Sequence, residues 1–304
     1  MNDFFQELGK QLAARWLSLL AVPGALYVAA CLIAAQLGQA HALQVHRLID
    51  ALNTLGTHES HRPAMTQALT LIAFLLAASA IGLVVQALSG PVRALCLGQW
   101  PRGAGFLADR LAERRNRRWH ALLDQRRGLE ARTPKSARTS TEQREIDRIA
   151  GRMNAMSRAE PGRPTWMGDR IHALSQVAVN RYGLDLEFGW SRLWLTLPSD
   201  RVREEISAAQ STFAAAVYTF TWSVPYLILA AWWWPSAAVA VVIAATGRQR
   251  CRAGIDLLAD LVEAVIDTDG RTLAIALGVA PPDSTGPLTP DEGQSITQIV
   301  RKGR

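Results

Sequence analysis

The sequence lacks most of the features that would point to a small secreted protein or to a familiar enzyme. Its three cysteines, Cys31, Cys96 and Cys251, are too few and too scattered for a disulfide framework. It has no glycine-rich phosphate loop, no Gly-x-Ser-x-Gly nucleophile motif and no paired zinc-histidine motif. We therefore expect no catalytic residues, no metal site and no cofactor.

Charge is missing from three long stretches. Residues 17–37 and 64–88 are uncharged and apolar, and each is long enough to cross the roughly 30 Å hydrocarbon core of a bilayer as a helix. Residues 213–245 are too long for one span, and Trp232, Trp233 and Trp234 before Pro235 mark a turn at a membrane interface. We expect a third span from about residue 211 to 231 and a shorter fourth over 235–247, with a re-entrant segment as the alternative to the fourth.

Basic residues are concentrated at one end of each apolar stretch, and the loop at 38–63 holds only Arg47 and Arg62. At the basic ends lie Lys10 and Arg15 before the first, Arg93 and Arg102 after the second, Arg201 and Arg203 before the third, and Arg248, Arg250 and Arg252 after the fourth. Because cytoplasmic loops carry the excess of Lys and Arg, four spans with both termini in the cytoplasm of a bacterial cell satisfy every end. The first stretch is also longer than a signal-peptide core, so we expect an uncleaved anchor rather than a cleaved signal.

This topology predicts the domain organisation. Residues 1–88 form a transmembrane hairpin with an outer loop at 38–63, and residues 89–210 form an arginine-rich helical cytoplasmic module with a linker near 130–140. A second transmembrane hairpin occupies 211–247, a cytoplasmic amphipathic helix follows at 248–278, and a disordered tail fills 279–304. No strand-period alternation is present, so the expected fold class is all-α: a membrane bundle of about four helices with a helical module.

Local signals place several helix ends inside the module. Ser140 with Gln143 predicts a capping box, and Thr165 predicts the N-cap of a helix that runs through Tyr182. Gly183 is expected to end that helix.

The basic excess lies in the module. Residues 89–210 hold 21 Arg and one Lys against 14 acidic residues, a net charge of +8, whereas the whole chain carries +7. Such a segment suits nucleic acid, but beside membrane spans it is more typical of contact with anionic lipid headgroups on the cytoplasmic face. The headgroup candidates are Arg114, Arg115, Arg117, Arg118, Arg248, Arg250 and Arg252.

Three motifs in the module resemble a known pattern. They are Pro-Thr-Trp-Met-Gly-Asp at 164–169, Arg-Tyr-Gly-Leu-Asp at 181–185 and Trp-Ser-Arg-Leu-Trp at 190–194. The set is similar to that of a family of bacterial multi-pass membrane proteins without an assigned activity, in which it precedes a transmembrane hairpin. The resemblance covers residues 164–277, and Ser191 stands where the pattern has proline. It implies an architecture and no chemistry.

The same motifs supply the ligand or partner candidates. Arg181, Tyr182 and Asp185 form either a binding site or a structural corner, in which Gly183 has a positive φ and Arg181 pairs with Asp185; we favour the corner. Trp190 and Trp194, four residues apart, either stack a ligand or form an interfacial or core anchor beneath the third span, and we favour the anchor.

Two further clusters have an ordinary and a chemical interpretation. Four histidines (His41, His46, His58 and His61) lie in the predicted outer loop, and we favour solvated side chains over a metal or pH-sensing site. A stripe of acidic residues (Asp256, Asp260, Glu263 and Asp267) can bind a cation or perform acid–base chemistry, but it is more typical of the polar face of an amphipathic helix. That face is then either solvated or paired with the arginines at 110–118.

The predicted spans contain no ionisable side chain that would carry a coupling ion, which disfavours a coupled transporter. We expect a non-enzymatic membrane scaffold whose cytoplasmic module binds a protein partner or anionic lipid, and whose alanine-rich spans favour a homo-oligomer. An oligomeric pore gated by the module is the alternative, and a membrane-anchored enzyme is the least favoured.

Overall fold

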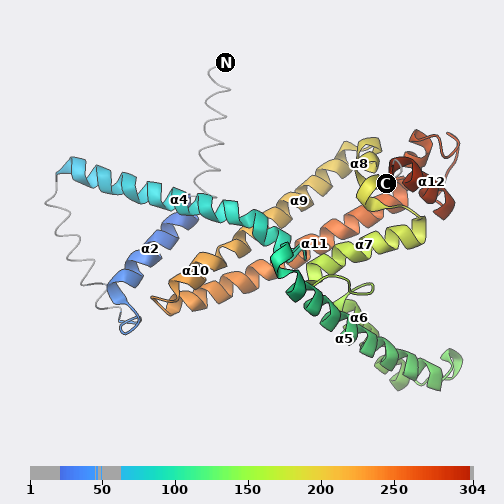
Figure 1. Ribbon diagram of the computed structural model, residues 1–304, viewed down its shortest axis with the longest axis horizontal. Helices are drawn as coiled ribbons and strands as arrows, with labels where there is room; N and C mark the ends of the chain where they lie inside the picture. The colour runs from blue at the N-terminus through green and yellow to red at the C-terminus, as the bar shows by residue number, and fades with distance from the viewer. Residues whose placement is uncertain (1–20, 45, 47–48, 50–62, 302–304) are drawn as a thin grey trace, which may run out of the picture. The chain divides into compact units, whose positions relative to one another are not determined.

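The computed structural model describes residues 21–44, 46, 49 and 63–301, and within these residues it contains helices and no strand (Figure 1). The predicted all-α class is confirmed. The start of the first predicted span, Lys10, Arg15, His58 and His61 lie outside the described residues. The α-helices are α2 (Val22–Leu37), α4 (Ala64–Cys96), α5 (Gly105–Arg132), α6 (Ser140–Met156), α7 (Trp166–Tyr182), α8 (Leu186–Thr196), α9 (Asp200–Thr221), α10 (Ser223–Leu229), α11 (Pro235–Ala276) and α12 (Pro290–Arg301).

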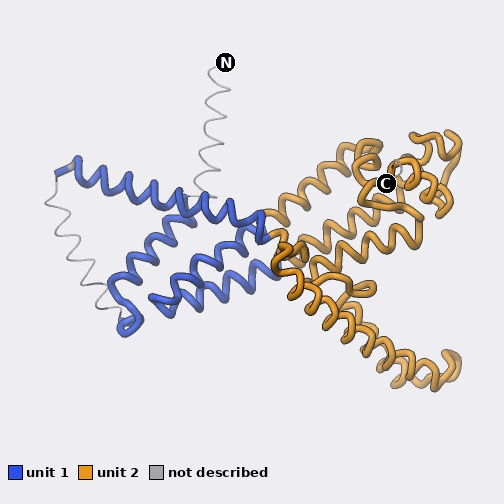
Figure 2. The backbone as a smooth tube through the Cα atoms, viewed as in Figure 1, with its two compact units in different colours: residues 1–92, 215–250 blue, residues 93–214, 251–304 orange. Residues whose placement is uncertain are grey.

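The chain divides into two compact units, which Figure 2 shows in different colours. Unit 1 comprises residues 1–92 and 215–250, and unit 2 comprises residues 93–214 and 251–304. The chain thus passes between units after residues 92, 214 and 250, whereas the domain boundaries predicted from the sequence follow residues 88, 210 and 247.

Unit 1 is built on close contacts between small residues. A side chain at Gly24 of α2 would collide with the backbone of Ala78 in α4, and Ala78 is fully buried. A Cβ at Gly247 of α11 would also come too close to the backbone of Phe220 in α9, 2.7 Å from its Cα. Small residues at these positions let the two helix backbones approach closely.

One glutamine joins two turns of unit 1. Gln39, just after α2, donates from Nε2 to the carbonyls of Ala230 (3.0 Å) and Ala231 (2.8 Å), and its Oε1 accepts from the backbone N–H of Trp234 (3.1 Å). The Trp233 indole also donates to the Ala42 carbonyl at 3.2 Å. The predicted turn at the tryptophan triplet is therefore confirmed, and Gln39 satisfies backbone groups that the ends of α10 and α11 leave unpaired.

Within the part of the chain that the structure describes, two helical stretches are long and apolar enough to cross a membrane: Met65–Cys96, and Asp200–Leu229, which includes α9 and α10. The apolar helix Val22–Leu37 is shorter. In α11, Arg248, Arg250 and Arg252 follow the apolar residues that begin at Pro235. The presence of four membrane spans therefore stays a prediction.

Unit 2 has its own apolar core, which α7, α8, α11 and α12 share. Its fully buried side chains include Leu184, Leu193, Leu273 and Ile296. Ile296 belongs to α12, so the predicted disordered tail is wrong over 290–301. The low apolar content of the tail suggested disorder, but its few apolar residues fall on one face of a helix, where Ile296 and Val300 are buried.

Two local predictions also need correction. The capping box consists of Thr139 and Glu142, one residue before the predicted pair, because Thr139 rather than Ser140 takes the extended N-cap conformation. The predicted fourth span and the amphipathic helix are not separate elements, since both lie in the uninterrupted α11. The N-cap at Thr165 and the helix end at Gly183 are confirmed.

The contact at Gly24 can be tested by substitution. Gly24→Leu should lower the free energy of unfolding by about 1–3 kcal/mol or more, because the added side chain forces α2 away from α4. The measurement is thermal unfolding of the purified protein in detergent. Gly90→Leu in α4 is the control, since nothing lies within 4 Å of the position that its Cβ would occupy. Equal losses in the two variants would contradict the close packing.

Candidate functional site

The carboxylate of Asp169 is the centre of a buried network in unit 2. Asp169 is 1% exposed, and its Oδ2 accepts a hydrogen bond from Nε of Arg115 on α5 at 2.9 Å and lies 2.7 Å from Nη2 of the same guanidinium. Its Oδ1 accepts from the backbone N–H groups of Gly162 (2.9 Å) and Arg163 (2.7 Å). A buried carboxylate needs such partners for each oxygen, so this network fixes α5 and the 161–163 loop against the start of α7.

The next residue, Arg170, makes the complementary contact with α11. This buried guanidinium donates from Nε to Asp256 at 2.9 Å and from Nη2 to Asp260 at 2.5 Å, while Arg158 adds a 2.8 Å bond to Asp260. The interpretation in which the acidic stripe pairs with the arginines at 110–118 is wrong. Arg115, the one member of that run with a carboxylate partner among the described residues, pairs with Asp169.

The last turn of α4 is joined to the first turn of α7. The Thr165 hydroxyl caps α7 by accepting from the Gly168 N–H at 3.0 Å, and it donates to the Cys96 carbonyl at 2.6 Å. Gly98 has a φ of +75°, which lets the chain turn sharply after α4. The Trp100 indole donates to the Leu95 carbonyl at 3.2 Å, so its ring lies beside the last turn of α4.

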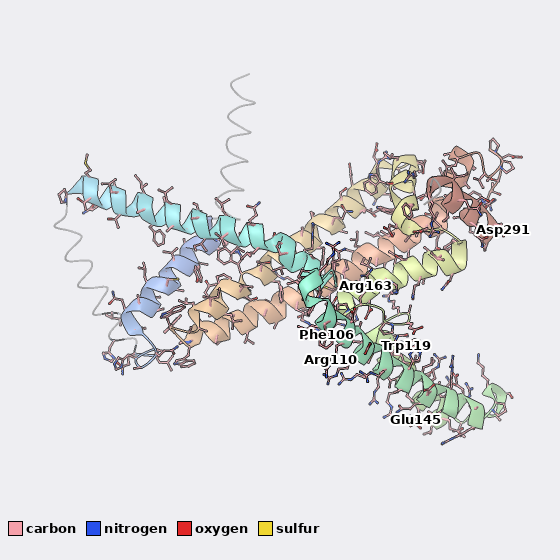
Figure 3. All side chains as sticks on the ribbon, in the orientation of Figure 1. Phe106, Arg110, Trp119, Glu145, Arg163 and Asp291 are labelled. Atoms are coloured by element: carbon pink, nitrogen blue, oxygen red, sulfur yellow. The ribbon has the colours of Figure 1, made fainter. Side chains whose placement is uncertain are left out.

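The first half of α5 presents an exposed face of mixed chemistry, which we call the α5 face. Figure 3 shows Phe106 and Arg110 on one side of α5 and Trp119 on another. The inward side carries Ala108, which is buried, and Arg115. The α5 face consists of Phe106, Leu107, Arg110, Leu111, Arg114, Arg117 and Arg118, all of them exposed.

The predicted headgroup candidates thus fall into two groups. Arg114, Arg117 and Arg118 are exposed on the α5 face, and Arg248 and Arg250 are exposed on α11, all without an ion pair to any described residue. Two other candidates are already engaged in protein contacts: Arg115 with Asp169, and Arg252, whose guanidinium lies 4.1 Å from the centre of the Trp166 ring.

The Arg-Tyr-Gly-Leu-Asp motif forms a corner that α12 closes. Gly183 has a φ of +66° and lies against the Pro290 carbonyl, as the predicted corner requires. The predicted pair between Arg181 and Asp185 is wrong, because the turn at Gly183 sends the two side chains to different helices. Asp185 pairs with Arg301 of α12 at 2.6 Å, and Arg181 lies 3.8 Å from Asp267 of α11.

Tyr182 is buried in this corner and donates a hydrogen bond from its hydroxyl to Asp267. Burial and the adjacent Asp267 carboxylate both disfavour the phenolate, and they raise the pKa of Tyr182 to about 12. The hydroxyl is therefore a hydrogen-bond donor at neutral pH, which is a structural role rather than that of a general base.

The remaining candidates also belong to the interior of unit 2. Trp190 and Trp194 of α8 are partly buried against the apolar core, with ring centroids 6.0 Å apart. This placement favours the anchor over the stacked-ligand interpretation. Among the described residues, no three His, Cys, Asp or Glu side chains come together in a group that could hold a metal ion.

Comparisons of the chain with protein-family models, with curated proteins and with solved structures found no match. The resemblance to the bacterial membrane-protein family stays a prediction.

The sequence reasoning missed the two central residues of unit 2. In the sequence, Asp169 was considered only as the last residue of the motif at 164–169, and Arg170 and Arg158 were not singled out. The available signal was the adjacent Asp169-Arg170 pair near the start of an apolar helix, since charged residues at such a position need partners if they are buried.

Replacing the central carboxylate should destabilise unit 2. Asp169→Asn should lower the free energy of unfolding by about 3 kcal/mol, because Arg115 loses its counter-charge and one amide N–H₂ must face backbone donors. For a unit of this size the melting temperature should fall by roughly 2–4 °C per kcal/mol. Asp124→Asn, at an exposed position of α5, the helix that carries Arg115, is the control and should have no measurable effect. A comparable loss of stability in Asp124→Asn would show that the buried network around Asp169 adds no more stability than an exposed carboxylate does.

The Tyr182 hydrogen bond predicts a pH-dependent stability difference. Tyr182→Phe should lower the free energy of unfolding by about 1 kcal/mol at pH 8, because the partly hydrated Asp267 carboxylate loses one hydrogen-bond donor. The folded pKa is raised, so the stabilisation is complete below the unfolded value of about 10 and is lost as pH rises toward 12. Melting temperatures of the two proteins should therefore converge between pH 8 and pH 11. A constant difference over this range would contradict the assignment.

Proposed function

We propose that this protein is a multi-pass membrane protein that holds a non-enzymatic helical module at the cytoplasmic surface. The observation that carries the proposal is the exposure of apolar side chains in unit 1. Only 17% of the most apolar part of α4 is buried, and Met65 and Leu76 are 77% and 64% exposed. The core helix of a soluble protein would be mostly buried, whereas lipid solvates such a surface.

The contacts of Gln39 support the orientation. They bring the end of α2 beside the turn between α10 and α11, so the two connections belong to the same end of unit 1. The turn at 230–234 carries no charge, and exposed tryptophans such as Trp232 and Trp234 suit a membrane interface. Arg248 and Arg250 lie at the other end of the apolar part of α11. In the proposal α2, α4, the α9–α10 stretch and the first part of α11 are four spans, and both termini are cytoplasmic.

The pore alternative depends on polar side chains of the spans. The hydroxyls of Thr70, Ser79 and Thr219 each donate to a backbone carbonyl of their own helix, at 2.9, 2.7 and 3.0 Å. Thr221 is fully buried and bonded in the same way to Val217. These hydroxyls need no water-filled path to be satisfied, so the anchored module is favoured over the pore.

The topology can be tested by cysteine accessibility in intact cells. In a variant with Cys31, Cys96 and Cys251 replaced by alanine, single cysteines are introduced at Leu43, Trp232 or Ser284. A membrane-impermeant maleimide should label the first two in intact cells and the third only after permeabilisation. Labelling of Leu43→Cys and Ser284→Cys from the same side would overturn the orientation, and recovery of the protein in the soluble fraction would overturn the membrane assignment.

A further inference from the structure

The α5 face combines two properties that are rarely found together on a soluble surface. Its apolar side chains are well exposed, with Phe106 at 72%, Leu107 at 55% and Leu111 at 38%. Its four arginines are exposed as well, and no described carboxylate lies within ion-pair distance of them.

The helix geometry collects these residues on a single side. At about 100° per residue, the positions from Phe106 to Arg118 that form the α5 face fall within a sector of roughly 140°. The two acidic residues of this stretch, Asp109 and Glu113, fall outside the sector. Apolar and cationic side chains of this segment therefore share one face of α5. The opposite side of the helix packs on the rest of unit 2.

The α5 face is continuous with the end of a candidate membrane span. Trp100 lines an open groove together with Leu107, Leu111 and three of the arginines (Arg110, Arg114 and Arg117). The Trp100 indole is bonded to the Leu95 carbonyl in the last turn of α4. If α4 crosses the membrane, this groove begins at the level where hydrocarbon gives way to headgroups, which is where tryptophan is enriched.

We propose that the α5 face binds anionic phospholipid headgroups of the bilayer that α4 crosses. Phe106, Leu107 and Leu111 enter the boundary between headgroups and acyl chains, while Arg110, Arg114 and Arg117 contact lipid phosphates. This inference rests on the proposed membrane function and adds to it the class of ligand and the surface that binds it.

The mixture of side chains favours lipid over the other anionic partners. Nucleic acid would engage the arginines through its phosphates, but its backbone offers nothing to bury the exposed Phe106 and Leu107 beside them. The membrane affinity of an interfacial helix has two contributions that add: the burial of its apolar side chains and the attraction of its cationic side chains to anionic lipid. An acidic protein surface is the remaining competitor, and the experiment includes it as an outcome.

The test uses the full chain in lipid nanodiscs. An environment-sensitive fluorophore is attached to Leu107→Cys in the variant without native cysteines, and quenching by spin-labelled lipid is measured. The discs contain phosphatidylcholine alone or mixed with phosphatidylglycerol. Quenching should be strong in the anionic discs and should weaken at high salt, because the attraction to the headgroups is screened.

Two triple variants test whether lipid binding depends on the arginines of the α5 face or on the total positive charge of the module. Arg110→Gln/Arg114→Gln/Arg117→Gln should lower the docked-to-free ratio on the order of 100-fold, since each arginine near an anionic surface contributes about one kcal/mol and 1.4 kcal/mol is tenfold. Arg127→Gln/Lys135→Gln/Arg152→Gln removes the same charge from exposed positions outside the α5 face and should leave quenching unchanged.

The outcomes distinguish this inference from the proposed function. Equal quenching with and without phosphatidylglycerol, or equal loss in both charge variants, would overturn lipid binding by the α5 face. A label that lipid does not quench, but that is protected from solvent in native membranes, would overturn it in favour of a protein partner. Extraction of the protein by alkaline carbonate would instead overturn the membrane assignment, whatever the label shows.

Discussion

Two neighbouring residues of opposite charge organise the module. Asp169 contacts α5 and the loop before α7, and Arg170 contacts α11, so one peptide unit links three parts of the chain that lie far apart in sequence. Both side chains are buried, and each has several partners, as burial of a charge requires. The α5 face depends on this arrangement, because the bond from Arg115 to Asp169 determines which side of α5 faces inward.

Unit 1 achieves order by different means. Its helices carry few charges, and in the membrane setting that we propose, apolar side chains that face lipid contribute little to helix association. Specific contacts therefore come from backbone proximity at Gly24 and Gly247, and from a single amide at Gln39 that bonds three backbone groups. The same chain thus uses close backbone packing in the unit that we assign to lipid and charge pairing in the unit that we assign to water.

Local features of the structure could be predicted from the sequence, whereas contacts between distant helices could not. Thr165, Gly183 and the tryptophan turn were predictable because caps and turns depend on a few adjacent residues. The partners of Arg181, Asp185 and the acidic stripe were not, since they follow from how α7, α11 and α12 meet. The tail was mistaken for disorder because composition averages over its length, whereas burial depends on the positions of Leu288, Ile296 and Val300. On α5, the cluster of arginines was visible in the sequence, but the one that turns inward was not.

The discontinuity of unit 2 has a consequence for biosynthesis. Its core unites Leu184 and Leu193, which are made before the second apolar hairpin, with Leu273 and Ile296, which are made after it. A nascent chain that has reached residue 214 therefore holds Asp169 with its partner Arg115 but leaves Arg170 without Asp256 and Asp260. In the proposed topology, the module completes its core only if the hairpin returns the chain to the side of the membrane from which it left. Insertion of the hairpin and completion of the module would in that topology be a single assembly event.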